Sequence, residues 1–234
     1  AAFLRAAGHR VTVSTEWNGT PADAMLALHA RRSHASIKAF PGPVILALTG
    51  TDVYHDIHHS PEARESLDLA DRLIVLQPKA AEEFATRKKV HVVVQSSATR
   101  MRHQPIKNSF RICVIGHLRA VKDPLLTLRA LQYVSLEIEV VQLGELLEPE
   151  LKPETRDSRY RWLGSVPHAR ALRWLASSHA MVISSRMEGG ANVVCEALRI
   201  GVPVLASRIS GNVGLLGERY AGYFKVGDER DLAR

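Results

Sequence analysis

The stretch SRMEGGANVVCEALRIGVPVLAS, residues 185–207, decides the fold that we predict for this chain. It follows one apolar, strand-like run and ends in another. Between them, Gly189 and Gly190 allow the backbone to approach a ligand closely, and Asn192 is a residue type that caps helices. A helix beginning there would direct its free N–H groups at the occupant of the glycine loop. The pattern predicts strand, loop, helix and strand, with a binding site at the loop.

Two carboxylates flank this loop. Glu188 precedes the glycine pair, and Glu196 follows Asn192 by about one helical turn, so both can face the same ligand. A carboxylate is a good bidentate acceptor for the hydroxyls of a vicinal diol, and a ligand with one ribose and one hexose would offer each glutamate a diol. The plainer interpretation is a loop acid and a solvated helix residue.

Length and composition indicate a globular protein of two domains. A chain of 234 residues exceeds the usual single-domain size, which favours two domains of about 100–130 residues. No apolar run approaches the roughly 18 residues of a membrane helix, and no signal peptide is visible. The two cysteines, Cys113 and Cys195, lie in apolar runs, which favours buried thiols and predicts a cytoplasmic protein without membrane contact.

The charge balance favours an anionic partner. The chain has 31 basic and 24 acidic residues, a net charge of +7. The basic residues are scattered, and the chain lacks both a Lys/Arg tract and the interleaved aromatic residues of an RNA-binding sheet. We therefore predict a phosphorylated small molecule as the ligand and no nucleic acid.

Short apolar runs alternate with helix-like stretches from end to end, as in parallel α/β sheets. The predicted strands of the first half are 9–15, 23–29, 43–49, 72–77 and 89–96, with helices at 60–72 and 78–88. Those of the second half are 110–116, 137–144, 160–164, 180–185, 202–207 and 222–227. Because the runs are continuous and do not alternate with polar residues, we expect both faces of each sheet to be buried.

These patterns predict an α/β protein with two Rossmann-like, doubly wound parallel-sheet domains that face each other across a cleft. Residues 97–109 are polar and aperiodic, as in an interdomain linker, so we place the domains at 1–104 and 105–234. The chain opens like the end of one helix and closes like the start of another, which predicts that both termini are truncated.

A second stretch, GHLRAVKDP at 116–124, also follows a strand end, where open parallel sheets bind ligands. Arg119 and Lys122 precede a helix start expected at Asp123-Pro124, an arrangement that can hold a diphosphate. Taken alone, an ordinary loop with surface charges is the plainer interpretation.

Together the two stretches resemble the donor site of GT-B-fold glycosyltransferases, with its E-x7-E motif, glycine-rich loop and following helix. The lysine aligns directly, whereas His117 stands at the usual arginine position and Arg119 lies two residues later. The resemblance implies a nucleotide-sugar donor bound by the second domain and no metal or other cofactor. It implies that Glu188 faces the hexose, the loop backbone the phosphate and Glu196 the ribose, with uracil read by backbone groups near Gly164. The implied donor-binding residues are His117, Arg119, Lys122, Gly164, Val166, Glu188, Gly189, Gly190, Ala191, Asn192 and Glu196.

A narrower resemblance covers both domains. The stretches LALHARRS, LALTGTDVYHDI, VIGHLRAVKDP, RYRWLG, SRMEGGANVV and SRISGNVGLLG are together similar to the selenosugar synthases of selenoneine biosynthesis. These enzymes join a sugar from a UDP-sugar to selenophosphate. The resemblance implies a hexosyltransferase that uses a UDP-sugar, such as UDP-GlcNAc, and selenophosphate to form a 1-selenosugar.

The strand ends of the first half fit such an inorganic anion, which needs concentrated positive charge and hydrogen-bond donors. His29 ends an otherwise apolar strand, which makes it hard to interpret as a surface residue. The plainer interpretation of the arginine pair beside it is a solvated helix start. The predicted acceptor-binding residues are Arg31, Arg32, Thr49, Gly50 and Thr51.

Asp52, His29 and Glu188 form the predicted catalytic set, with Asp52 as the candidate for acid–base or charge-stabilising work. The selenium of selenophosphate is already an anionic nucleophile, so positioning and stabilisation of the departing UDP would dominate. Without a carboxylate or cysteine to complete a metal site, three further histidines are predicted to lie at the surface: His55, His58 and His59.

Three other functions remain open. One is a glycosyltransferase with an ordinary alcohol acceptor, which would need an apolar or extended groove where the arginine pair stands. Another is a UDP-sugar 2-epimerase, which would need acid–base carboxylates and no acceptor anion. The third is a non-catalytic nucleotide-sugar or nucleic-acid binding module, against which the intact Glu188, Glu196 and Lys122 argue.

Overall fold

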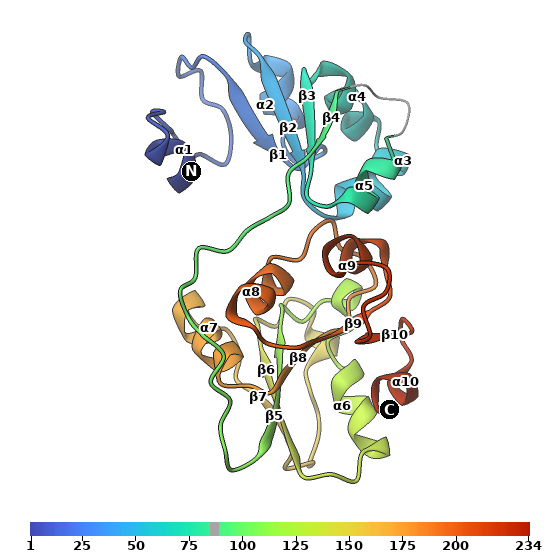
Figure 1. Cartoon of the computed structure of the whole chain (residues 1–234). Helices are drawn as coiled ribbons and strands as arrows, with labels where there is room; N and C mark the ends of the chain where they lie inside the picture. The colour runs from blue at the N-terminus through green and yellow to red at the C-terminus, as the bar shows by residue number, and fades with distance from the viewer. Residues whose placement is uncertain (85–88) are drawn as a thin grey trace.

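The computed structural model describes residues 1–84 and 89–234, which form two α/β domains stacked one above the other (Figure 1). The first domain contains a four-stranded sheet and the second a six-stranded sheet. All strand pairs within them are parallel. The prediction of two parallel-sheet α/β domains is confirmed.

In the first domain the strands lie side by side in chain order. They are β1 (Met25–Leu28), β2 (Val44–Leu48), β3 (Arg72–Val75) and β4 (Val90–Val92), connected through α2 (His34–Ala39), α3 (Ile57–His59), α4 (Pro61–Leu69) and α5 (Pro78–Glu82). Because right-handed crossovers place successive connections of such a sheet on the same side, the helices cover one face. On the other face Leu26 and Leu28 are 48% and 59% exposed. The expectation that both faces are buried is therefore wrong for this sheet.

Two local predictions for the first domain have different outcomes. Residues 9–15 follow α1 (Ala2–Ala6) as irregular chain and form no strand, and Val13 is 72% exposed. The apolar run predicts a strand, but a strand also needs a neighbour for its N–H and C=O groups, and none of the described strands pairs with it.

The helix predicted at 78–88 begins as α5, and residues 85–88 lie outside the described part of the chain.

The second domain winds outward from a central strand in both directions. The sheet order is β10-β9-β8-β5-β6-β7, so β5 and β8 bracket the point at which the winding reverses. The strands are β5 (Phe110–Ile115), β6 (Ile138–Leu143), β7 (Tyr160–Trp162), β8 (Ala180–Ile183), β9 (Val204–Ser207) and β10 (Tyr223–Phe224). The helices are α6 (Leu126–Ala130), α7 (His168–Ala176), α8 (Asn192–Ile200), α9 (Ser210–Leu216) and α10 (Glu229–Leu232). The central strand β8 is buried along its whole length, as predicted for a sheet covered on both faces.

Residues 93–109 join the domains without helix or strand and include the predicted linker, 97–109. The backbone N–H of His103 donates to the carbonyl of Ile200 at 3.0 Å, and that of Gln104 to the carbonyl of Ala176 at 2.8 Å. This connection is therefore attached to the second domain, and the boundary at residue 104 stays a prediction.

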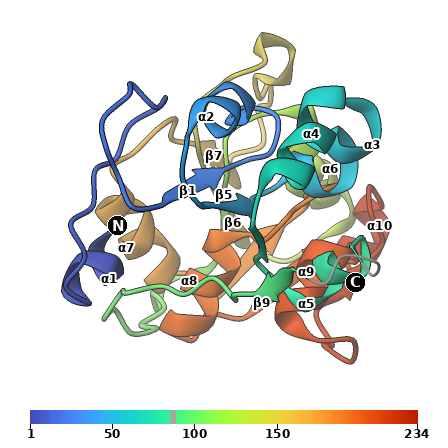
Figure 2. The same ribbon diagram turned by 90° about the horizontal axis from the view of Figure 1, so that it is seen from above.

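The two domains touch through α5 and α9, which lie together in both views (Figures 1 and 2). Lys79 Nζ and Glu218 Oε1 form an ion pair of 2.8 Å across this contact. Beside it, a β-carbon added to Gly189 would lie 2.6 Å from the backbone nitrogen of Gly50. Only glycine permits this approach, so the glycine-rich loop of the second domain packs directly on a loop of the first.

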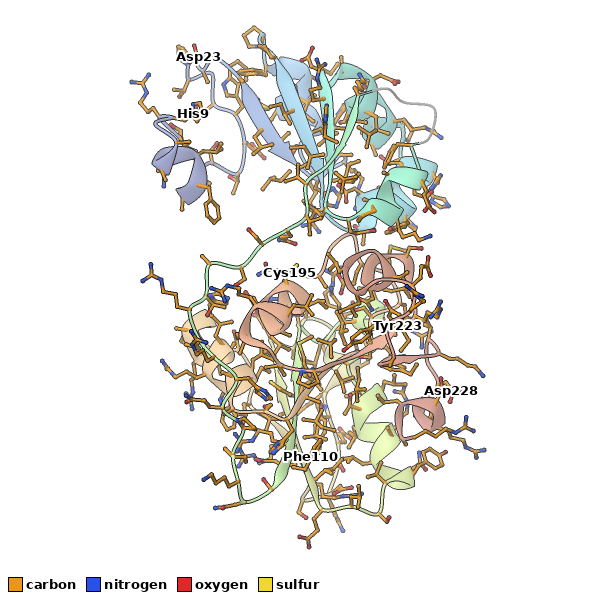
Figure 3. All side chains as sticks on the ribbon, in the orientation of Figure 1. His9, Asp23, Phe110, Cys195, Tyr223 and Asp228 are labelled. Atoms are coloured by element: carbon orange, nitrogen blue, oxygen red, sulfur yellow. The ribbon has the colours of Figure 1, made fainter. Side chains whose placement is uncertain are left out.

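Both cysteines are buried and free, as predicted. Burial raises the pKa of the Cys113 thiol to about 12, and Cys195 lies on α8 near the boundary between the domains (Figure 3). Among the helices of the described residues, none combines the length and the apolar character needed to cross a bilayer.

Candidate functional site

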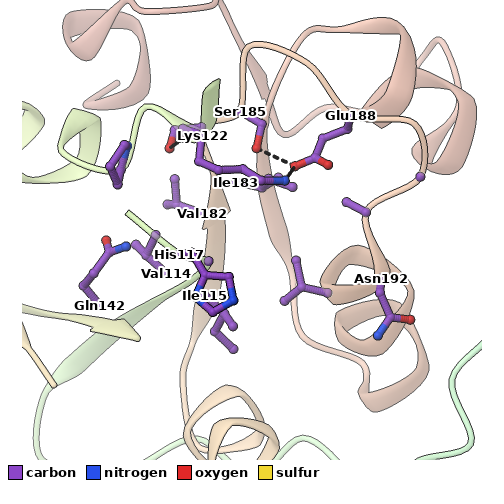
Figure 4. Close-up of a pocket in the computed structure, with 16 residues that line it drawn as sticks. Val114, Ile115, His117, Lys122, Gln142, Val182, Ile183, Ser185, Glu188 and Asn192 are labelled. Atoms are coloured by element: carbon purple, nitrogen blue, oxygen red, sulfur yellow. Dashed lines mark hydrogen bonds and ion pairs between the residues drawn. The ribbon is translucent and has the colours of Figure 1, made fainter. Parts of the chain in front are cut away.

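A cavity of about 240 Å³ opens at the carboxyl ends of β5 and β8, where the winding reverses (Figure 4). This is the edge of an open parallel sheet at which ligands bind. Its apolar lining comes from Val114 and Ile115 on β5 and from Val182 and Ile183 on β8. The polar side chains that line it are His117, Lys122, Gln142, Ser184, Ser185, Glu188 and Asn192.

Lys122 and Glu188 meet in this cavity from different loops. The ammonium group of Lys122 forms an ion pair with Oε1 of Glu188, and the hydroxyl of Ser185 donates to the same oxygen at 2.6 Å (Figure 4). Within the described residues, Oε2 of Glu188 has no hydrogen-bond partner. The structure thus brings together two of the residues predicted to bind the sugar donor. One carboxylate oxygen of Glu188 and ammonium hydrogens of Lys122 remain for a ligand.

Asp123 fixes the loop that carries Lys122. Its carboxylate accepts from Arg129 Nη2 at 2.9 Å and from Arg186 Nη2 at 2.7 Å, which ties the loop after β5 to the loop after β8. Its backbone is left-handed, with φ of 41°, so the helix expected at Asp123-Pro124 begins later, at Leu126. We did not predict this role, for which the only sequence signal is an acid beside the candidate lysine.

The start of α8 differs from the prediction. The N-cap residue is Ala191, without a side-chain cap, and Asn192 is the first residue of the helix. The side chain of Asn192 instead donates to Glu196 Oε1 at 2.8 Å, and Nε2 of His168 lies 2.7 Å from the same oxygen. The capping role of Asn192 is therefore wrong, because a carboxylate one turn away holds its amide. His168, at the start of α7, was not predicted.

The remaining predicted donor residues divide into two groups. Gly190, Ala191 and His117 line the cavity, and Nδ1 of His117 accepts the backbone N–H of Glu145 at 3.2 Å. Of the two cations considered for the first loop, His117 reaches the cavity wall and Arg119 does not. The predicted donor residues outside the lining are Arg119, Gly164, Val166, Gly189 and Glu196.

In the first domain, Asp52 is fully buried at the start of a π-helix, Asp52–Asp56. Its carboxylate accepts backbone N–H groups from Ala30 at 3.1 Å, Thr49 at 3.0 Å and Gly50 at 2.7 Å. The carboxylate therefore joins the loop after β1 to the loop after β2. Its predicted catalytic role stays a prediction.

His29 and Arg31 surround a second buried acid, Asp56, which sequence reasoning missed. Oδ2 of Asp56 lies 3.6 Å from His29 Nε2 and 3.4 Å from Arg31 Nε, and this buried oxygen has no hydrogen-bond partner among the described residues. His29 has φ of 76°, and its Nε2 also lies 3.3 Å from the hydroxyl of Thr51. Left-handed non-glycine residues and π-helices are both common at functional sites, and here they coincide. The signal available was a second aspartate four residues after Asp52.

Two predicted groups lie at the surface. The Arg32 side chain is exposed, and only its backbone N–H contacts His29, at 3.5 Å. The side chains of His55 and His58 are 58% and 50% exposed, and His59 is exposed too, as predicted. Within residues 1–84 and 89–234, no group of three or more His, Cys, Asp or Glu side chains could hold a metal ion. Independence from metal stays a prediction.

The second domain, which contains the cavity, matches a known protein family. Residues 109–234, more than half of the chain, match the family model of glycosyl transferases group 1. The chain belongs to this family. Its members' GT-B fold is also that of the structural neighbours, so the predicted fold class is confirmed.

Three solved structures are similar in fold to this group 1 glycosyl transferase. HepE from Anabaena, in complex with UDP and glucose, has a TM-score of 0.74 and 18% identity over 90% of this chain and 66% of that chain. Sucrose-phosphate synthase from Thermosynechococcus elongatus has a TM-score of 0.72 and 14% identity over 90% and 62%. TarM from S. aureus has a TM-score of 0.71 and 11% identity over 90% and 46%. The chain thus spans less than two thirds of the length of these proteins, and the likeness concerns the fold.

Proposed function

We propose that this group 1 glycosyl transferase binds a UDP-sugar in the cavity between β5 and β8 and transfers the sugar to selenophosphate. The first part of this proposal, binding of the UDP-sugar donor, rests on the ion pair between Lys122 and Glu188 at the cavity wall. Structures of HepE with UDP and with UDP-glucose support the choice of nucleotide.

The donor half follows from matching charges and hydrogen-bond roles. Lys122 and the N–H groups at the start of α8 suit a diphosphate, whose oxygens accept hydrogen bonds. Glu188 keeps Oε2 for a hexose diol. Glu196 accepts twice through Oε1 and keeps Oε2 for the ribose.

The second part of the proposal, transfer to selenophosphate, rests on two arginine side chains near the contact between the two domains. Gly50 packs against Gly189, so an anion held by Arg31 and Arg32 would lie near the donor loop. Selenium would attack the anomeric carbon, forming the C–Se bond while the C–O bond to UDP breaks and UDP leaves with the electron pair. The nucleophile is already an anion, so no general base and no metal are required. Lys122 would stabilise the departing diphosphate.

A second acceptor class, an ordinary alcohol, is favoured by one observation. Asp56 lies 3.4 Å from Arg31 and offsets part of the positive charge that an anion would need. The remaining charge comes from Arg32, which is exposed and free of ion pairs in the described part of the chain. We favour selenophosphate because Arg32 keeps its positive charge beside Arg31, whereas the second carboxylate of these loops, Asp52, is held by backbone N–H groups.

The test is to incubate the full-length protein with UDP-GlcNAc, with and without selenophosphate, and to follow UDP release and product mass. Parallel reactions replace selenophosphate with glycerol or glucose, and a second series uses UDP-glucose. Selenophosphate-dependent UDP release with a product of selenosugar mass supports the proposal. Release that depends only on the alcohols assigns the second class, and no affinity for UDP refutes the donor half.

A further inference from the structure

Gln142 is a polar residue buried in the middle of the second sheet. It lies on β6 with 1% of its surface exposed. In the register of the sheet, Val182 pairs with Val114, and Val114 pairs with Gln142, so two apolar residues precede the glutamine in this row. A buried strand position beside valines favours an apolar side chain, so the amide needs a hydrogen-bonding role.

The two ends of the Gln142 amide differ. Oε1 accepts from the hydroxyl of Tyr160 at 3.4 Å, whereas Nε2 has no hydrogen-bond partner among the described residues. Gln142 lines the cavity, and Figure 4 shows its amide nitrogen on the side of Val114 and His117. This nitrogen is not among the buried polar atoms that lack a partner, so it is open to the cavity, where a ligand oxygen can accept its N–H.

Other polar groups of the lining already have partners inside the protein. The hydroxyl of Ser184 donates to the carbonyls of Lys122 and Asp123, and that of Ser185 donates to Glu188. Gln142 therefore presents one of the few uncommitted donors of the cavity.

We propose that Gln142 Nε2 donates a hydrogen bond to the diphosphate of the bound nucleotide, which makes Gln142 a further donor-binding residue. This inference rests on the proposed function of the cavity. The hydroxyls of ribose and hexose donate hydrogen bonds, and Glu196 and Glu188 can accept them. Phosphate oxygens instead require groups that donate hydrogen bonds. An amide N–H that lines the same cavity as Lys122 and His117 matches the phosphate and not the sugars.

The test compares Gln142→Leu and Gln142→Met with the unchanged protein. UDP affinity is measured by calorimetry and uridine affinity by ligand-observed NMR. We expect the Kd for UDP to rise about tenfold, or about 1.4 kcal/mol, while uridine binding is unchanged. Methionine has the length of glutamine without its polar atoms, so it keeps the packing if leucine disturbs the fold. Unchanged UDP affinity, or an equal loss for uridine, would overturn the inference.

Tyr160→Phe is the matched control, because it removes the partner of Oε1 and leaves Nε2 in place. We expect its affinity for UDP to stay within twofold of the unchanged protein. A loss as large as that of Gln142→Met would mean that packing and not the amide N–H is responsible, and would refute the inference. If the unchanged protein binds no UDP, the proposed function fails. If the unchanged protein binds UDP and the glutamine variants bind it equally well, this inference fails alone.

Discussion

Two buried carboxylates, Asp52 and Glu188, stand on opposite sides of the contact between the domains and differ in their partners. Asp52 is fully buried and accepts backbone N–H groups from Ala30, Thr49 and Gly50. Glu188 is 8% exposed and is held by side chains. A carboxylate held by backbone groups cannot release them without unfolding its loops, whereas side chains can turn to a ligand. We therefore interpret Asp52 as a support of the loops after β1 and β2, and Glu188 as a candidate ligand-binding group.

The largest expected effect is on stability. Asp52→Ala would leave buried N–H groups without acceptors, and we expect the free energy of unfolding to fall by about 3 kcal/mol. Glu188→Ala should lower it by less than about 1 kcal/mol, because the Lys122 side chain is partly exposed and can be solvated. Urea denaturation of both variants measures the two values. Equal losses would remove the distinction between the two carboxylates.

The next effect concerns the cation that holds Glu188. Lys122→Ala should weaken UDP binding by about tenfold to a hundredfold, since a hydrogen bond to a charged group contributes about 1.5–3 kcal/mol. Calorimetric titration with UDP measures the change. Lys38→Ala is the matched control, because Lys38 pairs with Glu65 on the surface of the first domain. Similar affinities of both variants would refute a role for Lys122 in donor binding.

On the acceptor side, Arg31→Ala should raise the KM for selenophosphate about tenfold and leave the KM for the UDP-sugar unchanged. The physical reason is loss of a cation that would hold the acceptor anion. Steady-state kinetics with each substrate varied in turn separates the two constants, and Arg64→Ala, on the exposed face of α4, is the control. Equal changes in both KM values would contradict an anion site at Arg31.

The smallest expected effect is at Glu196. Its Oε1 is already occupied by Asn192 and His168, so only one oxygen remains for a ribose hydroxyl. Glu196→Ala should weaken UDP binding about fivefold, the value of one hydrogen bond of about 1 kcal/mol. The same titration measures this loss, and unchanged affinity would exclude Glu196 from the donor site.

Local patterns predicted most of the strands and the order of the elements around the glycine loop, because an apolar run and a glycine pair act over a few residues. The same rules failed where a partner outside the motif, or a competing side chain within it, decides the structure. Residues 9–15 have the apolar pattern of a strand, yet no described strand pairs with them. Asn192 has the chemistry of a cap, yet Glu196 holds its amide.

Three of the residues that we missed share one property. Asp56, Asp123 and Gln142 are buried polar residues whose importance depends on neighbours that are distant in sequence. Arg186 lies 63 residues from Asp123, for example, and their ion pair aligns two loops of the cavity. An isolated aspartate or glutamine in the sequence carries no signal of such a partner.

The sequence by itself determined two parallel α/β domains and a glycine-rich loop flanked by two glutamates, since periodicity and motif spacing are local properties of the chain. Only the tertiary structure decided which partner each charged group has. Lys122 and Glu188 are 66 residues apart and meet because β5 and β8 are neighbours in the sheet. Packing likewise decided that Gly189 contacts Gly50, because that approach joins two domains whose relative position no local pattern encodes.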